Sequence, residues 1–309
     1  MQGSGSGLGL GLGLSLGRIR IRFRVRAAED ATAGPAAAAY HRAMASTTSL
    51  QTTAGLWRTV RSWLGGWWQI VHLGAVMGVL ALSPASHRRL GVRGLVAHFY
   101  LASGPMLPGF TVVTALISLV VIRIVTVTAL SYGLTQYALE MVVRVLVLEL
   151  IPLAAALFAA LRTTLPMAAE LAALRARGQF ELLAAQGRDP LVEEVLPRLL
   201  AGMFAVLLLA ALSCVLTLGL AYLSVHGFTW GGFDGYTRTV GRVFNPAVSM
   251  IFVLKVFGLS GAVSLVPIAS ALQVAPRRTA RASVELQSLV RMFMLILLIE
   301  AASLVGNYY

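Results

Sequence analysis

Charge is scarce in this sequence of 309 residues. Only 12% of the residues are charged and 58% are hydrophobic, whereas a soluble domain has about 25% charged and roughly 45–50% apolar residues. Acidic residues are the scarcest, with 12 Asp and Glu against 25 Lys and Arg, for a formal net charge of +13. This composition excludes an ordinary soluble domain and indicates a membrane protein.

Cysteine is almost absent. Cys214 is the single one and lies inside an apolar run, which excludes a disulfide framework and a thiolate metal site. We interpret it as a packing residue. The five histidines are scattered and show no H-E-x-x-H spacing, so we expect no metal site and no zinc hydrolase.

Two motifs of catalytic chains are also missing. The sequence has no G-x-x-x-x-G-K-[ST] phosphate loop and no G-x-S-x-G nucleophile motif, and its carboxylates in apolar runs have no evident catalytic partner. We therefore expect a chain that is not an enzyme and holds no cofactor.

The basic excess suggests nucleic acid at first sight. The arginines, however, mostly gather in short segments beside apolar runs, which is the pattern that the positive-inside rule gives to cytoplasmic segments of membrane proteins. We therefore expect no nucleic-acid partner.

Residues 1–50 differ in character from the rest. They combine a Gly/Ser/Leu repeat, an Arg-alternating stretch and an Ala-rich stretch. Three interpretations remain: translated upstream sequence with the true start at Met44, which we favour, an Arg-rich targeting peptide, or a basic tail on anionic lipid. We exclude this extension, which is disordered or a mis-assigned start, from the fold.

The remaining chain predicts an all-α membrane protein. Residues 55–108 contain Trp, Arg and half-apolar stretches, which favour interfacial helices on the cytoplasmic face. Residues 109–309 form the predicted membrane domain, because five apolar stretches there approach the ~20 residues that span hydrocarbon. The predicted spans cover residues 110–136, 142–161, 199–225, 243–271 and 289–306.

Arginine distribution orients these five spans. The connections after the second and fourth spans are the Arg-rich ones, whereas the outer stretch "HGFTWGGFDGYTRT" at residues 226–239 carries only Arg238. The positive-inside rule then places the N-terminus in the cytoplasm and the C-terminus outside. The Arg-rich connections contain Arg162, Arg175, Arg177, Arg188 and Arg198, and then Arg277, Arg278 and Arg281.

The charged segment, residues 162–198, has a helical pattern rather than that of a loose loop. Residues 168–185 contain no Pro, and Gly187 can end a helix in the left-handed conformation. Asp189 and Pro190 are suited to the N-cap and first position of a second helix, with acidic residues near its positive end. We expect two short helices with a tight corner, and a bend of the chain at Pro197.

A series of short motifs runs through the charged segment and the predicted spans around it. They are "ELIP" at 149–152, Arg162, "AE" at 169–170, "LR" at 174–175, Gln179, Leu183, "GRDP" at 187–190, "PR" at 197–198, "YG" at 132–133, "WGGFD" at 230–234 and "LKVFG" at 254–258. This series resembles that of the MlaE-type permeases, which are membrane subunits of ABC transporters that move phospholipid. The likeness covers roughly residues 96–305 and marks a divergent member, in which Leu148 and the stretches 159–161 and 266–276 depart from the pattern.

The resemblance implies a coupling helix in the charged segment that docks on a separate cytoplasmic ABC ATPase, which would bind the ATP and Mg²⁺. It also implies an inner-membrane location, an MCE-type lipid-binding partner, a second permease copy or paralogue, and phospholipid as the substrate; a transit peptide at the N-terminus would imply an organellar envelope instead. The predicted coupling residues are Glu170, Arg175, Gln179, Gly187, Arg188, Asp189, Pro190 and Arg198.

Four ionisable residues stand out inside the predicted spans, where a charge is costly and faces protein, water or a polar ligand. Arg123 and Glu149 suit either a bidentate lipid-phosphate contact by the guanidinium or an internal ion pair between the two. Lys255 matches the family's Lys and suits a lipid headgroup or an outward-reaching position. We predict lipid binding by Arg123, Glu149 and Lys255, and we assign Glu300 no role.

Two other functions fit some of these features. One is the transmembrane component of an energy-coupling-factor vitamin transporter, which docks on ATPases through Ala-Arg-Gly motifs, since "ARG" occurs at 176–178. The other is an intramembrane enzyme acting on lipid, which would turn over without any ATPase.

Overall fold

The computed structural model describes residues 64–83, 92–273 and 278–308. All regular structure in this part of the chain is helical, as the sequence predicts. The predicted extension of residues 1–50, residues 55–63 and Arg277 lie outside the described residues.

Six described helical segments are long and apolar enough to cross a membrane, by length and composition. The chain is therefore a multi-pass membrane protein. The segments are Leu64–Leu82, Gly94–Ser131, Tyr137–Ala176, Leu191–His226, Pro246–Ala271 and Glu285–Asn307.

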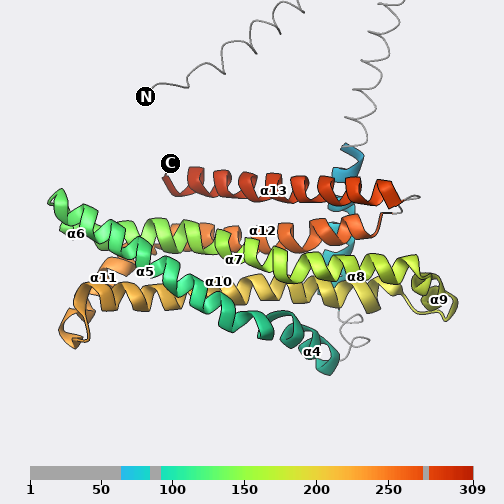
Figure 1. Ribbon diagram of the computed structural model, residues 1–309, viewed down its shortest axis with the longest axis horizontal. Coiled ribbons are helices and arrows are strands. Elements are labelled where there is room, and N and C mark those ends of the chain that lie inside the picture. The colour runs from blue at the N-terminus through green and yellow to red at the C-terminus, as the bar shows by residue number, and fades with distance from the viewer. Residues whose placement is uncertain (1–63, 84–91, 274–277, 309) are drawn as a thin grey trace, which may run out of the picture. The chain divides into compact units, whose positions relative to one another are not determined.

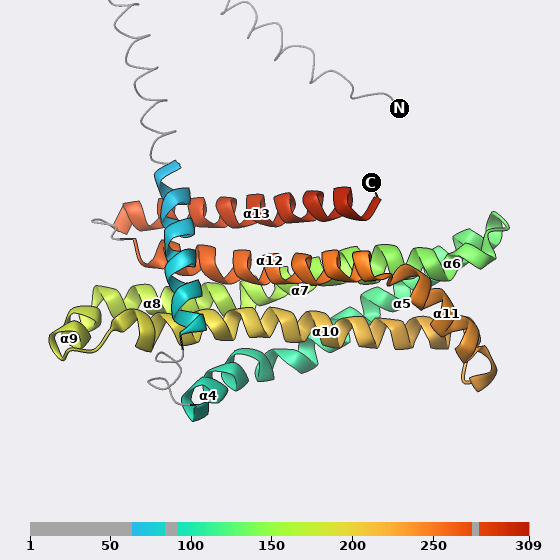
Figure 2. The same ribbon diagram turned by 180° about the vertical axis from the view of Figure 1, so that it is seen from behind.

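The first of these six helices was predicted as interfacial. From Trp68 onward it runs across the long helices rather than along them, as Figures 1 and 2 show. Met77 lies buried against Leu171, Leu196 and Ile268, so this helix covers the ends of three long helices. Its length would allow a crossing, but its transverse direction is typical of a helix in the headgroup layer.

The second long helix contains α4 (Val92–Ser103), the 3₁₀ turn Gly104–Met106 and α5 (Leu107–Ser131). The predicted span began only at residue 110. The helix starts earlier because the prolines of the GPM and LPG sequences occupy the first turns of new helical segments, where a missing N–H costs nothing. The same helix ends at Ser131, before the left-handed Gly133, rather than at residue 136.

The third long helix is built from α6 (Thr135–Val142), a wide π turn η2 (Val143–Leu150), α7 (Ile151–Ala159), a second π turn η3 (Ala160–Thr164) and α8 (Leu165–Ala176). It continues well past residue 161, where the predicted span stopped. The charged segment thus begins inside this helix.

Proline explains the wide turns. Each π segment is followed by an α segment whose second residue is Pro152, Pro166 or Pro197. The residue before each proline donates its N–H to the carbonyl five positions back. A proline ring removes the bond to residue i−4 and crowds that carbonyl, so the turn widens and the helix continues. The predicted bend at Pro197 is therefore replaced by a π turn, η4 (Leu191–Val195), that leads straight into α10 (Leu196–His226).

The remaining helices complete the bundle. A 3₁₀ turn (Trp230–Gly232) and α11 (Phe233–Val243) connect α10 to α12 (Pro246–Ala271), and α13 (Arg278–Tyr308) packs along α12. The predicted start of the fourth span at residue 243 is wrong, because Asn245 caps α12 by accepting from the Val248 N–H at 2.8 Å. Pro246 then holds the first helical position.

Candidate functional site

The charged segment is ordered but has one more corner than the sequence predicted. Helix α8 ends at Ala176, and α9 (Gln179–Ala185) begins after Gly178, whose φ is +73°. Residues 168–185 are therefore not one helix, because a glycine without Cβ adopts the left-handed conformation that stops α8. Gly187 adopts the predicted left-handed conformation, with φ +72°.

The second corner is held by side chains of the segment itself. The Leu191 N–H donates to the Asp189 carboxylate at 2.9 Å, which confirms the predicted N-cap. Arg188 clamps the first turn of the next helix through Glu193, with Nε–Oε1 2.8 Å and Nη2–Oε2 2.6 Å. Such a bidentate pair fixes the geometry of the turn.

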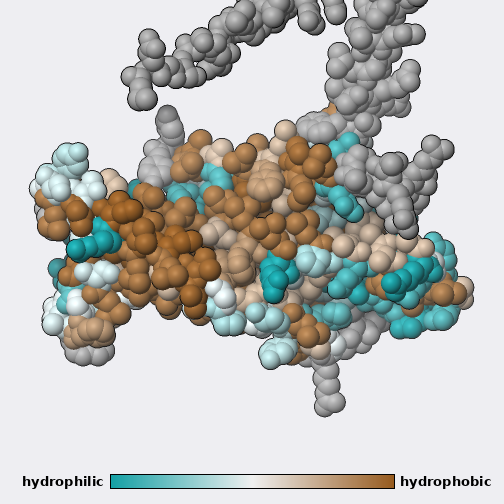
Figure 3. Space-filling model, in the orientation of Figure 1, coloured by the Kyte–Doolittle hydropathy of each residue, from teal (hydrophilic) through white to brown (hydrophobic). Residues whose placement is uncertain are grey.

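The other two predicted coupling arginines are also engaged within the chain. Arg198 pairs with Glu194 at 2.5 Å, and Arg175 donates to the Leu272 carbonyl at the end of α12. Other coupling candidates lie on the surface: Glu170, Gln179, Gly187, Arg188 and Asp189 are exposed. Figure 3 shows hydrophilic residues over the end of the bundle that contains α8 and α9, and apolar residues over its middle.

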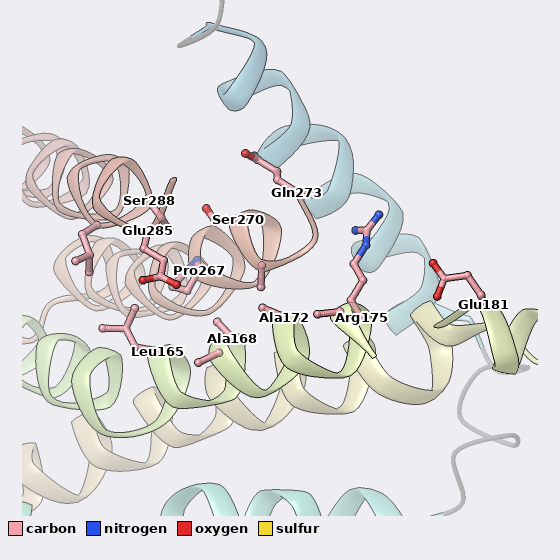
Figure 4. Close-up of a pocket in the computed structure, with 14 residues that line it drawn as sticks. Leu165, Ala168, Ala172, Arg175, Glu181, Pro267, Ser270, Gln273, Glu285 and Ser288 are labelled. Carbon is pink, nitrogen blue, oxygen red and sulfur yellow. The ribbon is translucent and has the colours of Figure 1, made fainter. Parts of the chain in front are cut away.

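A cavity of about 500 Å³ lies beside this segment, between α8, α12 and α13. Alanines of α8, among them Ala168 and Ala172, form one wall, and Arg175, Glu285 and Ser288 supply polar groups (Figure 4). Its volume is in the range of roughly 300–1,000 Å³ that small-molecule sites occupy. The sequence did not predict this cavity, because its walls come from three distant stretches.

A second group of charges lies deep in the bundle, around Lys255 on α12. This residue is 3% exposed and is the chain's single lysine. Its Nζ pairs with Glu149 Oε2, with Glu300 Oε2 at 2.6 Å, and with the Leu148 carbonyl at 3.1 Å. Because an ammonium has three N–H groups, these three acceptors saturate it.

Two of the three acceptors around Lys255, the Leu148 carbonyl and the Glu149 carboxylate, lie next to or within the "ELIP" stretch. Pro152 has no N–H to offer the Leu148 carbonyl four residues before it, and that carbonyl accepts from Lys255 instead. The π turn η2 carries both Leu148 and Glu149, and wide turns of this kind are frequent at functional sites.

The structure corrects one predicted pair and adds two residues. Glu149 pairs with Lys255 and not with Arg123, which lies on the exposed face of α5 and has no ion pair among the described residues. Glu300, which had no assigned role, is part of the cluster, and Asn307 Nδ2 donates to Glu149 Oε1 at 3.3 Å. The seven-residue spacing of Glu300 and Asn307 along one helix face was the available signal for this stripe.

Comparison with known proteins supports the family that the sequence motifs indicated. A comparison with curated proteins finds no match. A family model described as "Permease MlaE" matches residues 95–305, which is nearly the range of the likeness seen in the motifs. This family is one of permeases of ABC transporters and not of enzymes, and neither the vitamin-transporter nor the lipid-enzyme interpretation is favoured. A match over more than half of the sequence, on an all-helical bundle, shows that the chain belongs to the MlaE permease family.

Proposed function

We propose that this chain is the membrane subunit of an ABC transporter that moves phospholipid or a related lipid between envelope membranes. In this proposal a separate ATPase binds ATP and Mg²⁺ and drives the chain through the charged segment. The supporting observation is that two long helices run without a break into that segment, through α8 on one side and η4–α10 on the other.

Stiffness is what a coupling element requires. The Arg188–Glu193 and Arg198–Glu194 pairs and the Asp189 cap lock the second corner, so a displacement of α9 passes into α10 rather than being absorbed. The exposed residues Glu170, Gln179, Arg188 and Asp189 are the proposed contacts with the ATPase, while Arg175 and Arg198 hold the segment in shape.

The proposed topology has five crossings, with the N-terminus in the cytoplasm and the C-terminus outside. In this arrangement the transverse helix, from Trp68 to Leu82, lies in the cytoplasmic headgroup layer beside the charged segment. That position suits Trp68 and Val79, which are exposed apolar side chains on this helix.

Arg123 is the proposed contact for the lipid phosphate. Its side chain is exposed among the exposed apolar residues Leu119, Val120 and Ile124 of α5, and an unpaired guanidinium inside a span needs an anionic or watery partner. In this proposal Lys255 and Glu149 act differently, as an internal pair that links two spans and responds when the lipid arrives.

Transport in this scheme is a population shift. ATP binding closes the nucleotide subunits, the charged segments move with them, and the spans repack. The two arrangements must bind the lipid with different affinity, since a ligand with equal affinity for both shifts nothing. A second permease copy or paralogue and an MCE-type protein outside complete the proposed assembly.

Asp189→Lys tests the coupling role. We expect the variant to insert into the membrane and to lose the ATPase that purifies with the tagged wild-type chain. Asp234→Lys is the matched control, because Asp234 is an exposed aspartate in the first turn of α11, in the connection between α10 and α12. Equal ATPase recovery in all three samples would refute the docking role of the charged segment.

A further inference from the structure

The cluster around Lys255 has an unbalanced charge. Two carboxylates, Glu149 and Glu300, surround one ammonium, so the group carries a net charge of −1 when all three are ionised. An uncompensated charge inside a span is costly, because the hydrocarbon offers no solvation for it. The charged groups that face Glu300 are Lys255 from α12 and Glu149 from η2, and neither can supply the missing positive charge.

The hydrogen bonds of the same group show a matching deficit. Glu300 Oε1 and Asn307 Oδ1 are buried and have no hydrogen-bond partner. All three N–H groups of Lys255 are already engaged, and one Asn307 N–H already serves Glu149. Buried acceptors without donors are rare in folded proteins, because each costs the desolvation of a polar group.

Ser303 provides an independent sign of the same deficit. It lies on the face of α13 between Glu300 and Asn307, at spacings of three and four residues. Its side chain is 5% exposed, and its hydroxyl has no partner. Three polar side chains thus form one stripe along a face of α13, with two buried acceptor atoms and a buried hydroxyl left over.

We propose that this stripe is a proton-binding site and that Glu300 Oε1 carries the proton. One proton supplies the missing charge and the missing donor together, since a neutral carboxyl donates from Oε1 and still accepts from Lys255 at Oε2. Asn307 Oδ1 and the Ser303 hydroxyl are the acceptors on the same face. Release of the proton would set two carboxylates against one ammonium and weaken the contact between α12 and α13.

Infrared spectroscopy tests the proton directly on the full-length chain without ATPase or lipid substrate, so its outcome is separate from that of the transport proposal. At neutral pH we expect the wild-type spectrum to contain a carboxylic-acid C=O stretch that Glu300→Gln removes. Glu149→Gln is the matched control and should remove a carboxylate band instead. Loss of a carboxylate band in Glu300→Gln would overturn the proposal.

Stability gives a second measurement. The Gln amide is uncharged and can donate like the protonated carboxyl, so we expect Glu300→Gln to unfold at the wild-type temperature at acidic pH, where both side chains are neutral, and above it at neutral pH. The native wild-type chain holds a proton that the unfolded chain lacks above acidic pH, so its stability should fall as pH rises, and the variant should not follow. A variant that is less stable at neutral pH, or a wild-type acid band that disappears when Na⁺ replaces choline at fixed pH, would overturn the proton assignment.

Discussion

Lys255 donates to the carbonyl oxygen of Leu148 at 3.1 Å, across two spans and 107 positions of sequence. That carbonyl is available because Pro152 cannot donate to it. The proline thus has two effects. It widens the helical turn, and it leaves free a backbone carbonyl that binds the Lys255 ammonium together with the Glu149 carboxylate. A buried lysine is tolerated here because every N–H has an acceptor.

The buried position of Lys255 predicts its chemical reactivity. As the only lysine, it should resist an amine-reactive reagent in the folded protein and react in the unfolded one, as measured by mass spectrometry of the peptide that contains it. Lys255→Met should destabilise the protein by about 3–5 kcal/mol, because it leaves the Glu149 carboxylate without its ion-pair partner inside the bundle. Fast labelling in the folded state would contradict a buried Lys255 whose three N–H groups are all hydrogen-bonded.

Gly202 lies where α10 approaches α12 and η3 closely, so we expect it to tolerate no larger residue. A Cβ on this residue would lie 2.8 Å from Ser264 Oγ and 3.0 Å from Thr164 Cγ2, so Gly202→Ala should cost about 1–3 kcal/mol through overpacking. Gly219→Ala in the same helix meets nothing within 4 Å and should be neutral or slightly stabilising. Unfolding temperatures in one detergent compare the two, and equal temperatures would argue against a tight crossing at Gly202.

The exposed guanidinium of Arg123 predicts lipid binding. Arg123→Leu should lower the phospholipid that purifies with each chain, measured by phosphate analysis, because it removes a bidentate phosphate partner. Arg123→Lys keeps the positive charge but loses the planar guanidinium that can bind a phosphate through two N–H groups, and we expect it to retain part of the lipid. Equal lipid content in the wild type and Arg123→Leu would exclude the phosphate contact.

The buried hydroxyl of Tyr236 on α11 should make the stability of the protein fall at high pH. Its hydroxyl donates to the Leu218 carbonyl at 2.7 Å, and burial raises the pKa of Tyr236 to about 12. The unfolded side chain ionises near pKa about 10, so its stabilising contribution is complete below that pH and is lost as pH rises from there through 12. Tyr236→Phe should abolish the highest step in a tyrosinate absorbance titration, and an unchanged titration would contradict the burial of the hydroxyl.

Much of the architecture follows from local chemistry. Long apolar runs give helices that can span a membrane, whatever they pack against, because the bilayer core offers no partner for the backbone. Asp189 and Gly187 predicted the second corner correctly, because caps and left-handed turns depend on a few adjacent residues. Gly178 was misjudged, since a single glycine within a helical pattern either is tolerated or ends the helix, and local sequence does not decide between them.

Helix boundaries at prolines were the least predictable local feature. Pro152, Pro166 and Pro197 continue their helices through π turns. At Pro152 the released Leu148 carbonyl accepts from Lys255 of another helix, a partner that the local sequence does not reveal. The start of the second long helix was placed too late for a related reason: the prolines after Gly104 occupy first-turn positions, where they do not interrupt it.

The sequence by itself determined that this chain is a helical membrane protein with a charged, ordered segment between two long helices, because composition and capping act over short distances. The tertiary structure alone decided which charges meet. From the sequence, Arg123 and Glu149 could pair with each other. The rotation of each helix about its axis, set by packing along its whole length, instead turns Glu149 towards Lys255 and leaves Arg123 on the surface.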